Sequence, residues 1–171
     1  GMGHVIVFRA MELAIDKARS YGLGAVSVRN STHYGIAGYY AMMALEQDMI
    51  GISTTNAAVL VVPTFGRDAL YCTNPIALAV PAGEERPFVM DMATSTVPRG
   101  KLEVYNRQEK PLPLGWATDE TGLPTEDAGR VLDNLTRLKG GGLLPLGGAG
   151  ELFSGHKGFG LALMVDILSG V

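Results

Sequence analysis

Apolar residues recur along the chain with two different periods, and these periods predict helices and strands. Residues 7–19 carry small and apolar side chains every three or four positions, which is typical of a helix with one buried face. Ile76–Val80 is a continuous apolar run, and Phe88–Met92 follows it after a turn, as expected of two strands. Because no helical pattern separates these strands, they favour hairpins or a mixed sheet over a purely parallel sheet.

The stretch that contains His33 combines a strand pattern with polar residues and glycine. Residues 25–29 alternate as in a strand, residues 30–32 can hydrogen-bond to their own backbone and end it, and Gly35 permits a sharp turn before the next helix. His33 is therefore expected on a loop at the C-terminal end of a strand, where many α/β proteins bind ligands. There it can exchange a proton near neutral pH, although an ordinary loop histidine is the alternative.

The remainder of the chain predicts further strands, one more surface helix and a final apolar helix. Residues 50–55 and 59–62 favour strands, residues 97–110 favour a helix, and residues 111–150 are expected to be mostly loop. The final helix starts after Ser154 as its N-cap and has almost no polar face, so we expect it to be buried on all sides. Its apolar residues include Leu161, Leu163, Met164, Ile167 and Leu168.

Composition narrows the function classes. The chain has 171 residues, of which 47% are hydrophobic, enough for one domain over residues 1–171 with its own core. A net charge of -3 without a basic run argues against nucleic acid and anionic membranes as partners. The single Cys72 cannot form an internal disulfide, and the three histidines lack zinc-site spacing. We expect a cytoplasmic protein with no metal site and no membrane span.

Five ordered motifs resemble the malate/L-lactate (L-sulfolactate) dehydrogenase family. They are Arg29-Asn30-Ser31-Thr32-His33-Tyr34-Gly35, Thr73-Asn74-Pro75, Asp91-Met92-Ala93-Thr94-Ser95 with Arg99-Gly100-Lys101, Leu144-Pro145-Leu146-Gly147-Gly148, and Gly155-His156-Lys157-Gly158-Phe159-Gly160-Leu161. The resemblance covers nearly all of the chain but only the central part of a family member. It implies an α/β (α+β) fold with a mixed, largely antiparallel sheet and packed helices, which is a non-Rossmann nucleotide-binding domain. It also implies that the family's N-terminal and C-terminal segments are lacking.

The cofactor enters through this resemblance, because no GxGxxG or P-loop motif occurs in the sequence. The family binds NAD or NADP, and the matching cofactor positions are Asp91, Met92, Ala93, Thr94, Ser95, His156 and Lys157. Chemistry is compatible with this assignment, since an ionised Asp91 accepts hydrogen bonds and Lys157 near a helix N-terminus can meet phosphate. The alternative for Asp91 is a helix cap, and that for Lys157 is a solvated charge.

His33 matches the family's acid/base residue, which exchanges a proton with the substrate oxygen while nicotinamide transfers hydride. The resemblance thus implies an NAD(P)-dependent oxidoreductase that acts on a small 2-hydroxy or 2-oxo acid, and a homodimer. The family's substrate-binding segment, with an arginine suited to a carboxylate, has no counterpart in this sequence. The alternative is a truncated, catalytically incompetent domain that binds nucleotide or associates with itself.

Overall fold

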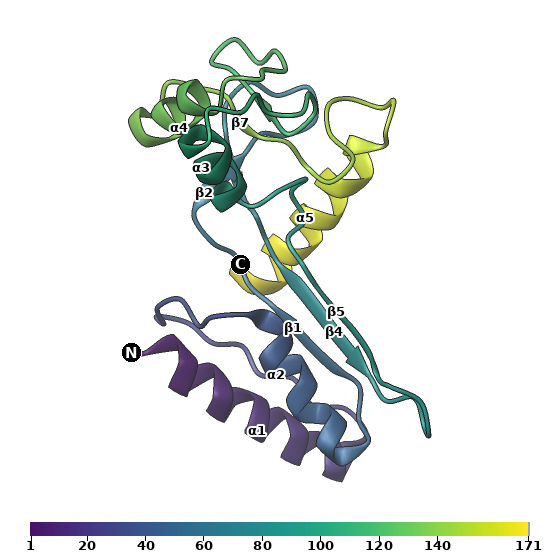
Figure 1. Cartoon of the computed structure of the whole chain (residues 1–171). Helices are drawn as coiled ribbons and strands as arrows, with labels where there is room; N and C mark the ends of the chain where they lie inside the picture. The colour runs from purple at the N-terminus through teal and green to yellow at the C-terminus, as the bar shows by residue number, and fades with distance from the viewer. Residues whose placement is uncertain (171) are drawn as a thin grey trace. The chain divides into compact units, whose positions relative to one another are not determined.

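The computed structural model describes residues 1–170 and divides the chain into two compact units (Figure 1). Unit 1 contains Gly1–Thr55 and Ile76–Met92, and unit 2 contains Asn56–Pro75 and the chain from Ala93 onward. The backbone therefore passes from one unit to the other after Thr55, after Pro75 and after Met92. The expectation of a single domain over the whole chain stays a prediction.

Unit 1 consists of an antiparallel sheet, a helix packed on that sheet, and a second helix packed on the first. Its elements are α1 (Gly3–Tyr21), α2 (Ala37–Met43), the 3-10 helix η1 (Ala44–Gln47), β1 (Gly51–Thr54), β4 (Ile76–Val80) and β5 (Phe88–Met92). The strands pair in the order β1-β4-β5, and α2 lies between this sheet and α1 (Figure 1). Small residues make this close approach possible, because the core contains Ala41, Ala77 and Ala79, all fully buried.

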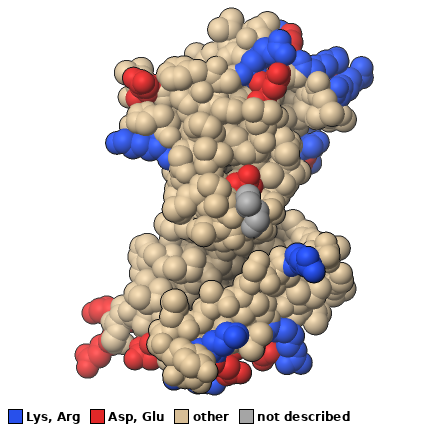
Figure 2. Space-filling view, turned by 180° about the vertical axis from the view of Figure 1, so that it is seen from behind, with Lys and Arg blue, Asp and Glu red and all other residues tan. Residues whose placement is uncertain are grey.

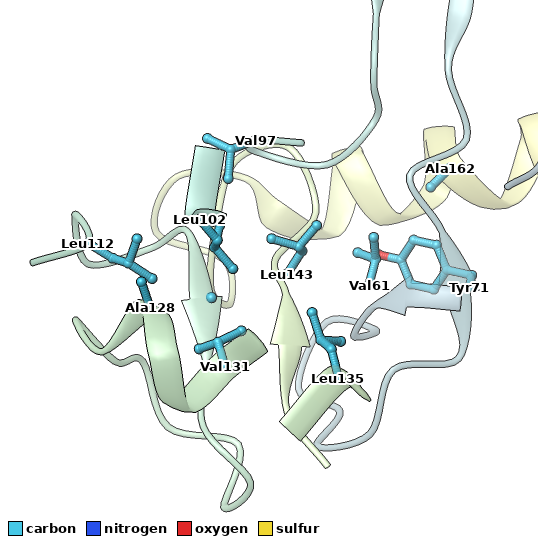
Figure 3. Packing of buried hydrophobic residues seen from close by; sticks show 11 residues of the cluster. Val61, Tyr71, Val97, Leu102, Leu112, Ala128, Val131, Leu135, Leu143 and Ala162 are labelled. Atoms are coloured by element: carbon cyan, nitrogen blue, oxygen red, sulfur yellow. The ribbon is translucent and has the colours of Figure 1, made fainter. Parts of the chain in front are cut away.

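Unit 2 surrounds a second, mixed sheet. Its elements are β2 (Val59–Val61), β3 (Tyr71–Cys72), α3 (Arg99–Arg107), β6 (Ala117–Thr118), α4 (Ala128–Arg137), β7 (Gly142–Leu143) and α5 (Gly155–Gly170). The strand order is β3-β2-β7-β6, in which only β2 and β7 are parallel. Figure 3 shows Leu102 of α3, Val131 of α4 and Leu143 of β7 pointing toward one another in its core.

The predicted fold class is confirmed, since the sheets are mixed, largely antiparallel and covered by helices. The apolar runs predicted β4 and β5 with their observed bounds. The first helix was also predicted, and it extends beyond residues 7–19 at both ends. Gly22 adopts a left-handed φ of 80° and donates its backbone N–H to the carbonyl of Ala18, which closes the last turn of α1.

The predicted strand over residues 25–29 is wrong. This segment pairs with no strand in the part of the chain that the structure describes, and it lies mostly exposed between α1 and α2. Alternation alone does not make a strand, because the backbone also needs a neighbouring strand for its hydrogen bonds. At Gly24 the segment instead lies against α1, where a Cβ atom would overlap the carbonyl oxygen of Ala14.

Helix α4 lies inside the segment predicted to be mostly loop, so that prediction is wrong for residues 128–137. The side chain of Asp127 accepts a hydrogen bond from the backbone N–H of Arg130 and caps the helix. Ala128, Val131 and Leu135 fall at helical spacing and are all buried. The signal was therefore present in the sequence, although Gly129 and polar neighbours weaken it.

The prediction that the final helix is buried on all sides is wrong for this chain. Only Gly155, Gly158, Ala162 and Val165 of α5 are buried. On the other faces Ile167 is 61% exposed and Leu168 is 66% exposed. The helix does begin directly after Ser154, as predicted, although Ser154 has a left-handed φ of 65° rather than the extended conformation usual for an N-cap.

Charged side chains of both signs are interspersed on the surface. Figure 2 shows Lys and Arg side chains beside Asp and Glu side chains on the face in view. Among residues 1–170, no helix is long and apolar enough to cross a membrane. The cytoplasmic location expected from the sequence stays a prediction.

Candidate functional site

His33 is exposed on the loop between α1 and α2 in unit 1. Its Nδ1 atom accepts a hydrogen bond of 3.0 Å from the backbone N–H of Gly35, which has a left-handed φ of 86°. A neutral imidazole that accepts at Nδ1 carries its proton on Nε2. To donate a proton as an acid, the ring must first become imidazolium, and its Nδ1 then can no longer accept from Gly35.

Tyr34 anchors the His33 loop to the core of unit 1. Its ring is buried against Tyr40, and its hydroxyl lies 3.4 Å from the hydroxyl of Ser53. The hydroxyl of Tyr40 donates a 2.5 Å hydrogen bond to the backbone carbonyl of Tyr34. Burial raises the pKa of Tyr34, so its phenol stays protonated and serves as a fixed support beside His33.

Asp91, at the end of β5, hydrogen-bonds to the first turn of α2. Its Oδ2 atom accepts a 2.7 Å hydrogen bond from the backbone N–H of Gly38. A side chain at Gly38 would crowd this carboxylate, so glycine permits the approach. The structure thus brings Asp91 to the segment that follows His33, while Met92 continues the β5 ladder opposite Ile76. This bond occupies one carboxylate oxygen.

Ala93, Thr94 and Ser95 belong to unit 2, and the two hydroxyl groups in this segment bind backbone carbonyls. Thr94 is fully buried, and its Oγ1 lies 3.1 Å from the carbonyl of Thr73. Ser95 is also buried and donates to the carbonyl of Val97 at 2.9 Å. These hydrogen bonds fix the conformation of the segment. A role for the three residues in cofactor binding stays a prediction.

His156 and Lys157 are exposed in the first turn of α5. Lys157 lines a cleft of about 240 Å³, which is formed by the glycine loop before the helix and by the helix itself. Its other lining residues are Leu146, Gly147, Phe153, Ser154, Gly158 and Leu161. Gly158 is needed here because a Cβ atom at this position would overlap the carbonyl oxygen of Leu146.

The electrostatics of this cleft suit a bound anion. The Lys157 ammonium and the N-terminus of a 16-residue helix both favour an anion. With about 240 Å³, the cleft is smaller than the ~300–1,000 Å³ that encloses a drug-sized ligand, so it has room only for a small group. The predicted cofactor residues divide between the units, with Asp91 and Met92 in unit 1 and the others in unit 2.

A second cleft, of about 590 Å³, was not predicted from the sequence. It lies in unit 1 between α1 and the segment after His33, and it is lined by His4, Val5, Phe8, Arg9, Tyr34, Gly35, Ile36, Tyr39 and Tyr40. Its walls are mostly apolar and aromatic, and of the five sequence motifs only the first reaches them, through Tyr34 and Gly35. Within residues 1–170, no group of three or more His, Cys, Asp or Glu side chains is placed to hold a metal ion.

Comparison with known proteins identifies relatives along the whole chain. The family model described as malate/L-lactate dehydrogenase matches residues 1–171. The malate dehydrogenase of Pyrococcus abyssi is 57% identical over 171 residues, which are 100% of this chain and 45% of that protein. The L-sulfolactate dehydrogenase of Methanocaldococcus jannaschii is 42% identical over 171 residues, again 100% of this chain and 45% of that protein.

A solved structure agrees with the fold described above. The malate dehydrogenase of Entamoeba histolytica superimposes with a TM-score of 0.93 at 44% sequence identity. The match covers 99% of this chain and 47% of that chain. The chain therefore spans about 45% of the length of the curated relatives that it matches.

Proposed function

The chain belongs to the malate/L-lactate dehydrogenase family, and on that premise we propose that it is the cofactor-binding part of an NAD(P)-dependent oxidoreductase. The protein of which it is part transfers hydride between nicotinamide and a small 2-hydroxy or 2-oxo acid. The named relatives act on malate and on sulfolactate, and both are 2-hydroxy acids with a second anionic group. Their names therefore support this substrate class.

The observation that carries the proposal is the state of His33. Its ring is exposed, and the Gly35 hydrogen bond at Nδ1 assigns the proton of the neutral form to Nε2. Nε2 is consequently the ring nitrogen that is left to meet a substrate. In the imidazolium form it donates a proton to a substrate carbonyl oxygen, and in the neutral form with its proton on Nδ1 it accepts one from a substrate hydroxyl; both forms give up the Gly35 hydrogen bond. The cofactor supplies the hydride chemistry, and the chain supplies a proton-exchanging group on an anchored loop.

The cofactor is NAD or NADP in this proposal. In unit 2, Lys157 and the start of α5 bind phosphate, with His156 beside them. In unit 1, Asp91 has a second carboxylate oxygen that can accept from a hydroxyl or amide group. Met92, Ala93, Thr94 and Ser95 give the connecting segment its shape. Besides the cofactor, the expected partner is the substrate, a small 2-hydroxy or 2-oxo acid.

Replacement of His33 tests the acid/base role. In a full-length relative, changing the counterpart of His33 to Asn should lower turnover ~100-fold to 10,000-fold, as is typical of a lost acid/base group, and should leave cofactor affinity unchanged. The assay follows oxidation of the reduced nicotinamide with oxaloacetate, pyruvate and sulfopyruvate. Unchanged turnover with all three acids would remove His33 from the mechanism.

A second candidate is a domain that binds nucleotide and associates with itself without turnover. The exposed apolar face of α5 favours the self-association. Under this alternative, the purified chain binds the reduced nicotinamide cofactor but oxidises it no faster when a 2-oxo acid is added. Robust turnover by the purified chain with malate or lactate would exclude it.

A further inference from the structure

Asn74 is a fully buried polar residue in the short segment between β3 and β4. Its backbone has a left-handed φ of 35°, which Asn tolerates better than most residues. The side-chain Nδ2 donates a 2.8 Å hydrogen bond to the carbonyl of Ala162, in the middle of α5. The Oδ1 atom has no hydrogen-bond partner within residues 1–170.

A buried amide with only one of its two polar atoms hydrogen-bonded is not explained by its contribution to stability. A buried acceptor without a partner loses its hydration and gains nothing in return, whereas an apolar residue of similar size avoids that loss. The amide gains one hydrogen bond, to a helix carbonyl 88 positions away in the sequence. An arrangement of this kind fixes geometry, because its donor and acceptor belong to different elements.

The backbone of Asn74 is also tied to the segment predicted to bind the cofactor. The hydroxyl of Thr94 lies 3.0 Å from the carbonyl of Asn74, and the backbone N–H of Thr94 donates to the carbonyl of Thr73 at 2.9 Å. Thr94 in turn accepts a 2.8 Å hydrogen bond from the backbone N–H of Leu146. Leu146 lines the cleft that contains Lys157.

We propose that Asn74 is a positioning residue that holds α5 in register with the Thr94–Ser95 segment, so that both meet the same cofactor. The amide fixes α5 at Ala162, and the backbone carbonyl fixes Thr94. Lys157 lies on the same rigid helix as Ala162, so its place in the cleft follows from that bond. This inference rests on the proposed function, since it concerns how the same cofactor is held.

Two variants break the connection at different points. Asn74→Gly retains the left-handed backbone and removes the amide. Thr94→Val retains the shape of the side chain and removes the hydroxyl that lies between the carbonyls of Thr73 and Asn74. The matched control is Asn134→Ala. It removes another buried side-chain amide of unit 2, which lies on α4 and donates a 2.8 Å hydrogen bond to Glu120.

Cofactor affinity is the first measurement. In titrations of the whole chain with NADH and NADPH, Asn74→Gly and Thr94→Val should each weaken binding about 10-fold, as expected for one lost buried hydrogen bond. Asn134→Ala should bind as the parent chain does. If both test variants bind like the parent chain, or if the control weakens binding equally, the positioning role is wrong while the proposed function stands.

Amide hydrogen exchange is the second measurement and does not depend on the cofactor. In Asn74→Gly, exchange should accelerate at Thr94, at Leu146 and in the first turn of α5, and it should stay unchanged in α4. Unchanged exchange at these amides overturns the inference. If the parent chain binds neither cofactor, the proposed cofactor function fails instead, and the exchange pattern alone decides whether Asn74 fixes α5.

Discussion

At the scale of single residues, Glu120 shows how one ion pair anchors a loop to a helix. Its carboxylate accepts from Arg130 and, at 2.8 Å, from the amide of Asn134, both on α4. The hydrogen bond from Arg130 is the main cause that lowers the pKa of Glu120 from 4.5 to about 2. Asp119 also lies close to Arg130, at 3.3 Å.

This shift predicts an acid-sensitive contribution to stability. The folded-state pKa lies below the unfolded value, so the stabilisation is fully present above pH 4.5 and is lost as the pH falls toward about 2. Glu120→Gln should therefore flatten this part of the pH dependence, as should Arg130→Gln. Thermal unfolding across the acid range measures the effect, and a Glu120→Gln profile that follows the parent chain would contradict the assignment.

The hydrogen-bond partners of several single residues could not be predicted from the sequence. The motif around Asp91 marked Thr94 and Ser95 as candidates, but no feature of the sequence shows that both hydroxyls bind carbonyls inside the protein. The Thr73-Asn74-Pro75 motif contains Asn74, but its hydrogen bond could not have been predicted, because its partner Ala162 lies 88 positions away. Hydrogen bonds between distant segments depend on the fold and leave no local pattern.

Among the elements, α5 contains two glycines at which substitution by alanine should have opposite effects on stability. A Cβ atom at Gly158 would overlap the carbonyl of Leu146, whereas a Cβ atom at Gly160 would meet open space. Glycine inside a helix is about 0.5–1 kcal/mol less stable than alanine. Gly160→Ala should therefore raise the free energy of unfolding by up to about that amount, while Gly158→Ala should lower it by ~1–3 kcal/mol, as overpacking does.

Denaturant unfolding of the two glycine variants measures the difference. Because both variants add the same methyl group to the same helix, differences in helix propensity cancel between them. Equal changes in unfolding free energy would mean that the first turn of α5 does not pack against Leu146 as described. Titration of the Gly158→Ala variant with NADH then shows whether displacement of the first turn also lowers the affinity for the cofactor.

The predicted elements differ from the observed ones where a neighbour decides the outcome. Ile76–Val80 could be predicted because an apolar run with turns on both sides needs no further information. The segment 25–29 has the alternation of a strand but lacks a partner strand among the described residues. Helix α4 has an Asp127 cap and apolar spacing that would have identified it, and Gly129 obscured that pattern.

At the scale of the whole molecule, the exposed face of α5 predicts association. Leu163, Met164, Ile167 and Leu168 are all exposed on this helix. Clustered apolar surface of this kind marks an interface, and a symmetric homodimer is the commonest way to cover it. Leu168→Lys should shift the chain toward monomer in light scattering, whereas Leu138→Lys, at a residue 89% exposed directly after α4, should not. A parent chain that is monomeric and binds no hydrophobic dye would contradict the prediction.

We propose that this chain binds a nicotinamide dinucleotide through the start of α5. Equilibrium titration with NADH and with NADPH, followed by the fluorescence of the bound reduced nicotinamide, tests it most directly. We expect saturable binding of one or both cofactors, weakened about 10-fold by Lys157→Gln, because a charge-assisted contact to phosphate is lost. Lys110→Gln, at an exposed lysine outside the cleft, should have no effect. No saturable binding of either cofactor, or binding that Lys157→Gln leaves unchanged, would contradict the account.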